Sequence, residues 1–144
     1  MSHKDVVERL ERLGKELGFE VAHDPQKDSR IFEDKVELGR VDVVWFKNIS
    51  IGKIIKAKII VAAFEIHPPK TRSNKEIKGD LLNLFWSNAP LQVYVVPLKY
   101  LQNNAPKGWK QWYKRAFKNA VMTYARTLGL RNFKLIDYED LKFL

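Results

Sequence analysis

The sequence predicts a single α/β domain over residues 1–144, with a mixed central β-sheet flanked by helices in the order α-β-β-β-α-β-α-β. The length of 144 residues suits one folded core, because single cores typically organise roughly 100–200 residues. Hydrophobic residues make up 45% of the chain, enough apolar surface to offset the entropy cost of ordering it. Helical and strand periodicities alternate without a repeat or a linker, which indicates a mixed sheet with helices packed against it.

The N-terminal part predicts a helix followed by a short strand. Apolar side chains recur at helical spacing over residues 4–17, and Gly18 ends that helix. A short strand is expected at 19–21. Residues 23–39 form a polar connection to which no element is assigned.

Two longer strands are expected next, joined as a hairpin. Residues 41–46 are β-branched and apolar except for Asp42, which is typical of a strand. Residues 47–52 contain turn-forming side chains. The stretch 53–66 predicts a second strand that starts exposed and ends buried on both faces.

The second half predicts two helices and two strands. Periodicity indicates a helix over 74–87 and a second over 109–128, with strands at 91–96 and 133–136. Three aromatic residues of the last helix fall on its broad apolar stripe and are assigned to the core, although they could stack on bases if exposed. They are Trp109, Trp112 and Tyr113.

Charge and composition narrow the class of partner. The net charge is +9 and the pI is about 9.7, which favours a polyanionic partner such as DNA; the alternative is a lysine-rich surface that serves only solubility. The chain has no cysteine, which excludes disulfides, a thiol nucleophile and a thiolate zinc site. Its start is charged and amphipathic and it has no long apolar run, so we expect a soluble, cytoplasmic protein without membrane contact.

Two acidic residues stand in apolar surroundings. Asp42 lies in Arg40-Val41-Asp42-Val43-Val44, and Glu65 ends the most apolar strand of the chain. A hairpin register that brings the two carboxylates together would favour a divalent cation, Mg²⁺ or Mn²⁺, between them. The alternative is that Asp42 pairs with Arg40 or Arg30 and that Glu65 reaches solvent.

His67 is expected to share a face with Glu65, because side chains repeat every two residues along a strand. It could orient or deprotonate a water molecule near the two acids, or bind a softer metal. The alternative is a histidine that caps the end of the strand.

The strand-Asp, hairpin and strand-Glu pattern, with one helix before it and helix–strand–helix after it, resembles the PD-(D/E)XK nuclease superfamily. The resemblance covers nearly the whole chain and implies a restriction-endonuclease-like fold. It implies that Asp42 and Glu65 are metal ligands, and that His67 stands where the family usually has lysine.

Two further residues follow from this resemblance. Some relatives carry the catalytic lysine on the next helix, where Lys78 lies within the apolar arc; the alternative is that its chain passes the core to reach water. Relatives also use a first-helix glutamate at the metal, and Glu11 is the better placed candidate. An ordinary helical pair with Lys15 explains Glu11 equally well.

Basic residues form two groups. Lys70, Arg72, Lys75 and Lys78 cluster just after the acidic pair, in a loop that leads into a helix N-terminus, a setting suited to phosphate. Those of the last helix, including Lys114 and Lys118, are assigned to its solvated face.

Together these patterns predict a Mg²⁺- or Mn²⁺-dependent nuclease that hydrolyses phosphodiester bonds of DNA, as a homodimer or as a subunit of a larger assembly. The alternative is a catalytically inactive module of the same fold that binds nucleic acid or protein.

Overall fold

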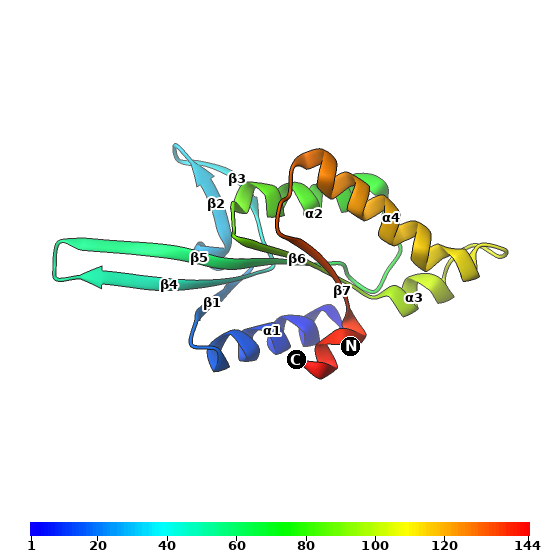
Figure 1. Ribbon diagram of the computed structural model, residues 1–144, viewed down its shortest axis with the longest axis horizontal. Helices are drawn as coiled ribbons and strands as arrows, with labels where there is room; N and C mark the ends of the chain where they lie inside the picture. The colour runs from blue at the N-terminus through cyan, green and yellow to red at the C-terminus, as the bar shows by residue number, and fades with distance from the viewer.

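A computed structural model describes all residues, 1–144. The chain forms a mixed five-stranded sheet with helices on both faces (Figure 1). The strand order is β1-β4-β5-β6-β7, antiparallel from β1 to β5 and parallel from β5 to β7. The expected α/β class and mixed sheet are confirmed. None of the helices is long and apolar enough to cross a membrane. The sheet strands are β1 (Glu20–His23), β4 (Val43–Ile51), β5 (Ile55–Ile66), β6 (Leu91–Val96) and β7 (Phe133–Asp137).

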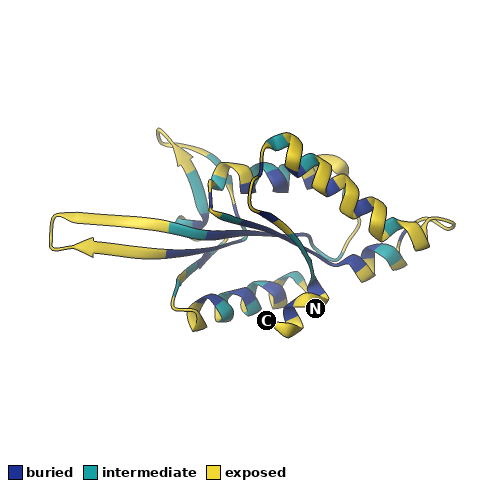
Figure 2. Cartoon of the chain, in the orientation of Figure 1, coloured by how far each residue is buried: buried dark blue, intermediate teal, exposed yellow.

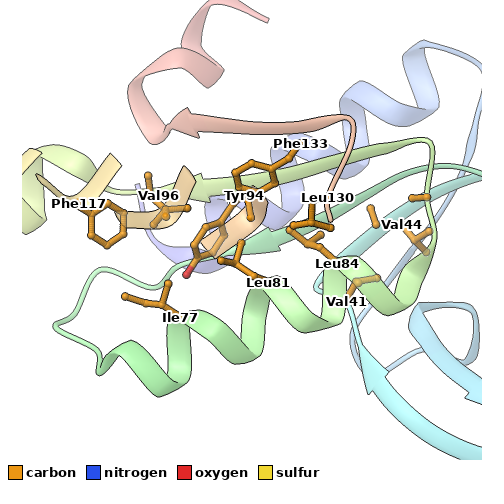
Figure 3. Packing of buried hydrophobic residues seen from close by; sticks show 14 of the residues in the cluster. Val41, Val44, Ile77, Leu81, Leu84, Tyr94, Val96, Phe117, Leu130 and Phe133 are labelled. Carbon is orange, nitrogen blue, oxygen red and sulfur yellow. The ribbon is translucent and has the colours of Figure 1, made fainter. Parts of the chain in front are cut away.

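Helices cover the two faces of the sheet unequally. One face packs on α1 (His3–Glu16) and on the C-terminal 3₁₀ turn η2 (Tyr138–Phe143). The other face packs on α2 (Asn74–Ser87) and α4 (Lys110–Leu128), with the short α3 (Leu98–Asn103) at the end of the sheet. Figure 3 shows the core beneath α2 and α4, where side chains of both helices meet those of β4 and β6.

Helices α1 and α2 both begin with a capping box. The Ser2 hydroxyl accepts a hydrogen bond from the backbone N–H of Asp5, and the Ser73 hydroxyl accepts one from the N–H of Glu76. The carboxylates of Asp5 and Glu76 in turn accept hydrogen bonds from the backbone N–H groups of Ser2 and Ser73. Such caps satisfy backbone N–H groups that a helix leaves free at its start. The expected helix over 74–87 coincides with α2.

The chain also contains elements that the sequence did not predict. The connection 23–39 holds a 3₁₀ turn, η1 (Lys27–Ser29), and a separate hairpin of β2 (Arg30–Glu33) and β3 (Val36–Arg40). The helix α3 was not expected either. The predicted element order therefore lacked these elements, which are only 3 to 6 residues long and too short to show a clear periodicity.

The hairpin of β4 and β5 extends far beyond the body of the molecule (Figure 1). The expected turn at 47–52 is wrong, because β4 continues to Ile51 and the ladder ends at the Ile51–Ile55 pair. All residues from Lys47 to Ile59 are exposed, and Figure 2 shows this part of the hairpin as almost entirely exposed. Asp42, expected within a strand, instead occupies a bend one residue before β4.

The apolar stripe of α4 is narrower than the sequence suggested. Phe117, Val121 and Ala125 are buried, whereas Trp109 is 61% exposed and Trp112 is 56% exposed. Trp112 lies roughly 140° from Phe117 around the helix, because each residue advances about 100°. The assignment of both tryptophans to the core is therefore wrong, while Tyr113 packs at its edge.

A close approach of α1 to the sheet gives a first testable prediction. A Cβ atom on Gly14 would lie 2.5 Å from Nε1 of Trp45, whose side chain is buried and donates a hydrogen bond to Leu10. Gly14→Ala should lower the free energy of unfolding by about 1–3 kcal/mol, because overpacking outweighs the helix preference of alanine.

Gly79 provides the matched control, because it is also helical and a Cβ there meets nothing within 4 Å. Gly79→Ala should raise the stability by about 0.5–1 kcal/mol. Urea unfolding of both variants measures the two changes, and a stabilised Gly14→Ala protein would contradict the tight packing of α1 on Trp45.

Candidate functional site: an acidic pocket at the end of β5

The β4–β5 register brings the two predicted acids together. The last ladder pair at this end is Val43 with Phe64, so Asp42 stands opposite Glu65 one step further on. Both side chains line a small open pocket of about 310 Å³ at the carboxyl end of β5. The pocket is also lined by His3, Ile66, Pro68, Lys70, Arg72, Glu76 and Asp80.

Asp42 is held in place by contacts from two directions. Its Oδ2 accepts a hydrogen bond of 2.7 Å from the backbone N–H of Ile66 and lies 3.5 Å from Nε2 of His3. The hydrogen bond to Asp42 raises the pKa of His3, although partial burial opposes the shift. Neither Arg30 nor Arg40 pairs with Asp42, because both arginines contact Glu37 instead.

Glu65 is the most deeply buried acid of the pocket, with 4% of its surface exposed. Burial raises its pKa well above the usual range, and repulsion from Asp42 and Asp80 raises it further. In the ionised form this carboxylate therefore lies close to like charges in poor solvent. A bound cation would relieve that repulsion.

Asp80 is a third acid at the site, and it is tied to a cation and a hydroxyl. Nη1 of Arg72 lies 2.5 Å from its Oδ2, and the Tyr94 hydroxyl donates a hydrogen bond of 2.8 Å to the same oxygen. Burial raises the pKa of Asp80, while the bond to Arg72 acts in the opposite direction. Asp80 was not predicted from the sequence, because an acid on an amphipathic helix resembles a surface residue.

His67 shares the sheet face of Glu65 but lies outside the pocket. It is 1% exposed, its Nδ1 is 2.7 Å from the Pro68 carbonyl, and its ring meets the edge of Phe117 at 6.0 Å between centroids. Burial lowers its pKa to about 4. Such a histidine is neutral at pH 7 and packs as part of the core.

The remaining predicted residues divide between the pocket and other places. Lys70 and Arg72 line the pocket. Lys78 instead lies over the ring of Tyr124, with Nζ 4.7 Å from its centroid. Glu11 pairs with Lys15 at 3.2 Å, about 12 Å along α1 from His3 at 1.5 Å per residue. Lys75 is exposed on the first turn of α2, outside the pocket.

The chemistry of the donors suits a hard cation with several water ligands. Mg²⁺ is commonly bound by one or two carboxylates while water fills its other positions. Asp42 and Glu65 can supply those two, since Asp80 is bound to Arg72. No group of three or more His, Cys, Asp or Glu side chains is arranged to hold a metal ion.

The buried histidine generates a prediction on pH dependence. Because folding lowers the pKa of His67 from 6.5 to about 4, its contribution to stability is complete above pH 6.5 and is lost as the pH falls toward 4. Between pH 7 and 4.5 this loss should reach about 2 kcal/mol.

His67→Asn keeps a side-chain donor for the Pro68 carbonyl and should remove that part of the pH dependence, whatever its effect at pH 7. Urea unfolding across this pH range measures it. His23→Asn, at the end of β1 and away from the Phe117 contact, is the comparison variant for a histidine substitution. Equal slopes for all three proteins would mean that His67 is not a neutral core residue.

Comparison with known proteins assigns no family to the chain. No protein-family model matches it, and neither a curated protein nor a solved structure does. The side chains of the pocket, together with the surface around it, therefore carry the functional interpretation.

Proposed function

We propose that the protein is a metal-dependent nuclease with a restriction-endonuclease-like fold, which hydrolyses phosphodiester bonds of DNA. The observation that carries the proposal is the meeting of Asp42 and Glu65 in one pocket, one residue beyond the β4–β5 ladder. Burial of Glu65 and its repulsion from Asp42 lower the stability of the fold, and a bound cation would compensate for both.

The basic side of the pocket suits the substrate. Lys70 lines the pocket from the loop before α2, and Arg72 lies beside it at Asp80. Opposite charges on two sides of one pocket would hold a phosphate near a cation bound by the acids. The net charge of +9 favours approach of a polyanion.

Each side chain then has a defined task. A divalent cation, when bound, supplies charge neutralisation and an activated water molecule. Asp42 and Glu65 would hold it, and the backbone N–H of Ile66 fixes the Asp42 carboxylate. Lys70 would stabilise the negative charge on the phosphate, which assigns it the task of the family lysine in place of His67 or Lys78.

A binding module without catalysis is the second candidate. It is favoured because no three His, Cys, Asp or Glu side chains converge to hold a metal ion, and because Asp80 is already engaged with Arg72. In that case Lys70 and the loop before α2 would be the functional surface, and the acids would be structural.

Substitution of the first acid separates the two candidates. Asp42→Asn keeps an oxygen for the Ile66 N–H but removes the charge, so it should lower Mg²⁺- or Mn²⁺-dependent cleavage at least about a hundredfold while binding is retained. Cleavage rates on single-stranded, duplex and branched DNA measure this loss. Glu139→Ala, an exposed acid paired with Lys142, is the control. A wild-type protein that cuts none of these substrates would exclude the enzyme.

The lysine assignment has its own test. Lys70→Ala should slow cleavage about tenfold or more, because a charge at the phosphate is lost, and Lys70→Arg should restore part of the rate. Lys75→Ala is the matched control, since Lys75 lies on the adjacent helix but outside the pocket, and it should change the rate less than about twofold. Cleavage rates of the Lys70 and Lys75 variants are compared at saturating metal. Equal rates for the two alanine variants would contradict the role of Lys70.

A further inference from the structure

The C-terminal half of the chain carries an unusual charge distribution. Between Asp80 and Asp137 there is no Asp or Glu, while nine Lys and Arg residues occur. Helix α4 itself contains no acid. This segment thus offers no internal partner for its positive charges, and a polyanion complements it.

Two tryptophans are exposed at the start of that helix. Trp109 is 61% exposed and Trp112 is 56% exposed, and they lie in the same first turn, where the Trp112 N–H donates to the Trp109 carbonyl at 3.0 Å. Residues three apart on a helix are neighbours on its surface. Large apolar side chains left in water side by side indicate a surface that is covered by a partner.

A basic hollow lies on the same helix, and one residue of its lining, Gln111, directly precedes Trp112 in the chain. It has a volume of about 350 Å³, lies between α3 and α4, and has no hydrophobic residue in its lining. The residues that line it are Gln102, Gln111, Lys114, Arg115, Lys118 and Asn119. Cationic and amide side chains of this kind suit a phosphate.

We infer that Trp109, Trp112 and the basic hollow of the same helix form a binding surface for single-stranded nucleic acid. Bases of an unpaired segment would stack on the two indole rings, while Lys114, Arg115 and Lys118 would contact the phosphates. Stacking needs a free base face, so a duplex cannot use the tryptophans in this way. A second copy of the chain fits less well, because it too carries a net charge of +9.

The surface lies at the same end of the sheet as the acidic pocket. On α4 the ring of Phe117 lies 6.0 Å from that of His67, which follows the end of β5 two residues after Glu65, and the start of α4 lies at this end of the sheet (Figure 1). The inference rests on the proposed function for its nucleic-acid substrate and deepens it: the substrate carries an unpaired segment near the bond that is cut.

The test measures binding without cleavage. Fluorescence anisotropy of a labelled oligothymidylate of about 15 nucleotides, in EDTA, reports binding to the full chain and to its Asp42→Asn variant. Trp109→Ala/Trp112→Ala should bind at least about tenfold more weakly, because two stacking platforms are lost. Trp86→Ala is the matched control, since Trp86 is 38% exposed on α2 and should leave affinity unchanged.

Salt dependence separates the two kinds of contact. Lys114→Ala/Lys118→Ala should reduce the slope of log affinity against log salt by about 1.4, at roughly 0.7 per phosphate contact with a single strand. The tryptophan variant should lose affinity with its slope unchanged. Lys99→Ala/Lys134→Ala removes the same charge from exposed positions outside the hollow and should match the wild type.

Several outcomes would overturn the inference. They are unchanged affinity in the double tryptophan variant, equal affinity of the wild type for duplex and single strand, or a dimer that the tryptophan substitutions dissociate while oligonucleotide binding persists. Trp112→Phe keeps an aromatic face and should retain binding. Retained binding in this variant would show that Trp112 acts through its aromatic face and not only through the fold. A chain that binds through this surface yet cuts nothing would contradict only the proposed nuclease activity.

Discussion

The antiparallel ladder between β4 and β5 is the interaction on which the rest of the structure depends. It aligns Val43 with Phe64 and thereby sets Asp42 opposite Glu65, while the parallel pairing of β5 with β6 places Tyr94 beside Glu65. A slip of one residue would turn Glu65 to the opposite face of the sheet. The apolar residues that alternate along these strands pack against different helices, and this packing penalises such a slip.

The three acids of the site differ in how far neighbouring groups compensate their negative charge. Asp80 has Arg72 and the Tyr94 hydroxyl, and Asp42 has a backbone N–H and His3, whereas Glu65 has mainly like-charged neighbours. Replacing one buried partner would leave another charge without compensation, which is usually more costly than the pair itself is stabilising. The pocket is therefore better understood as a set of coupled groups than as two independent acids.

The residues that sequence could identify were those whose chemistry conflicts with their surroundings. Asp42 and Glu65 stand out because a carboxylate within an apolar run needs a reason, and the helix over 74–87 stands out because its apolar spacing is regular. Asp80 does not stand out, since its neighbours on α2 include polar residues and its partner Arg72 comes from the preceding loop. Such a contact depends on tertiary geometry rather than on spacing.

Errors of prediction had equally physical causes. Asn48, Ser50 and Gly52 favour a turn locally, but the cross-strand pairing of their neighbours extends the ladder to Ile51. The apolar stripe of α4 appeared wider than the face that packs on the core, because apolar spacing alone does not show how wide the covered face is. Trp109 and Trp112 lie outside the buried face that Phe117, Val121 and Ala125 define, so their apolar character alone did not predict their exposure.

The hairpin that projects from the body has a mechanical consequence. Strands β4 and β5 run from the tip of the hairpin to the pocket, where Asp42 directly precedes β4 and Glu65 lies near the end of β5. The register shift between Trp45 and Phe46 places the extra residue Val61 between the exposed and buried parts, and a bulge is where a strand pair bends and twists most readily. A load applied at the tip would be taken up as bending at Val61, which leaves the spacing of Asp42 and Glu65 insulated from motion of the hairpin.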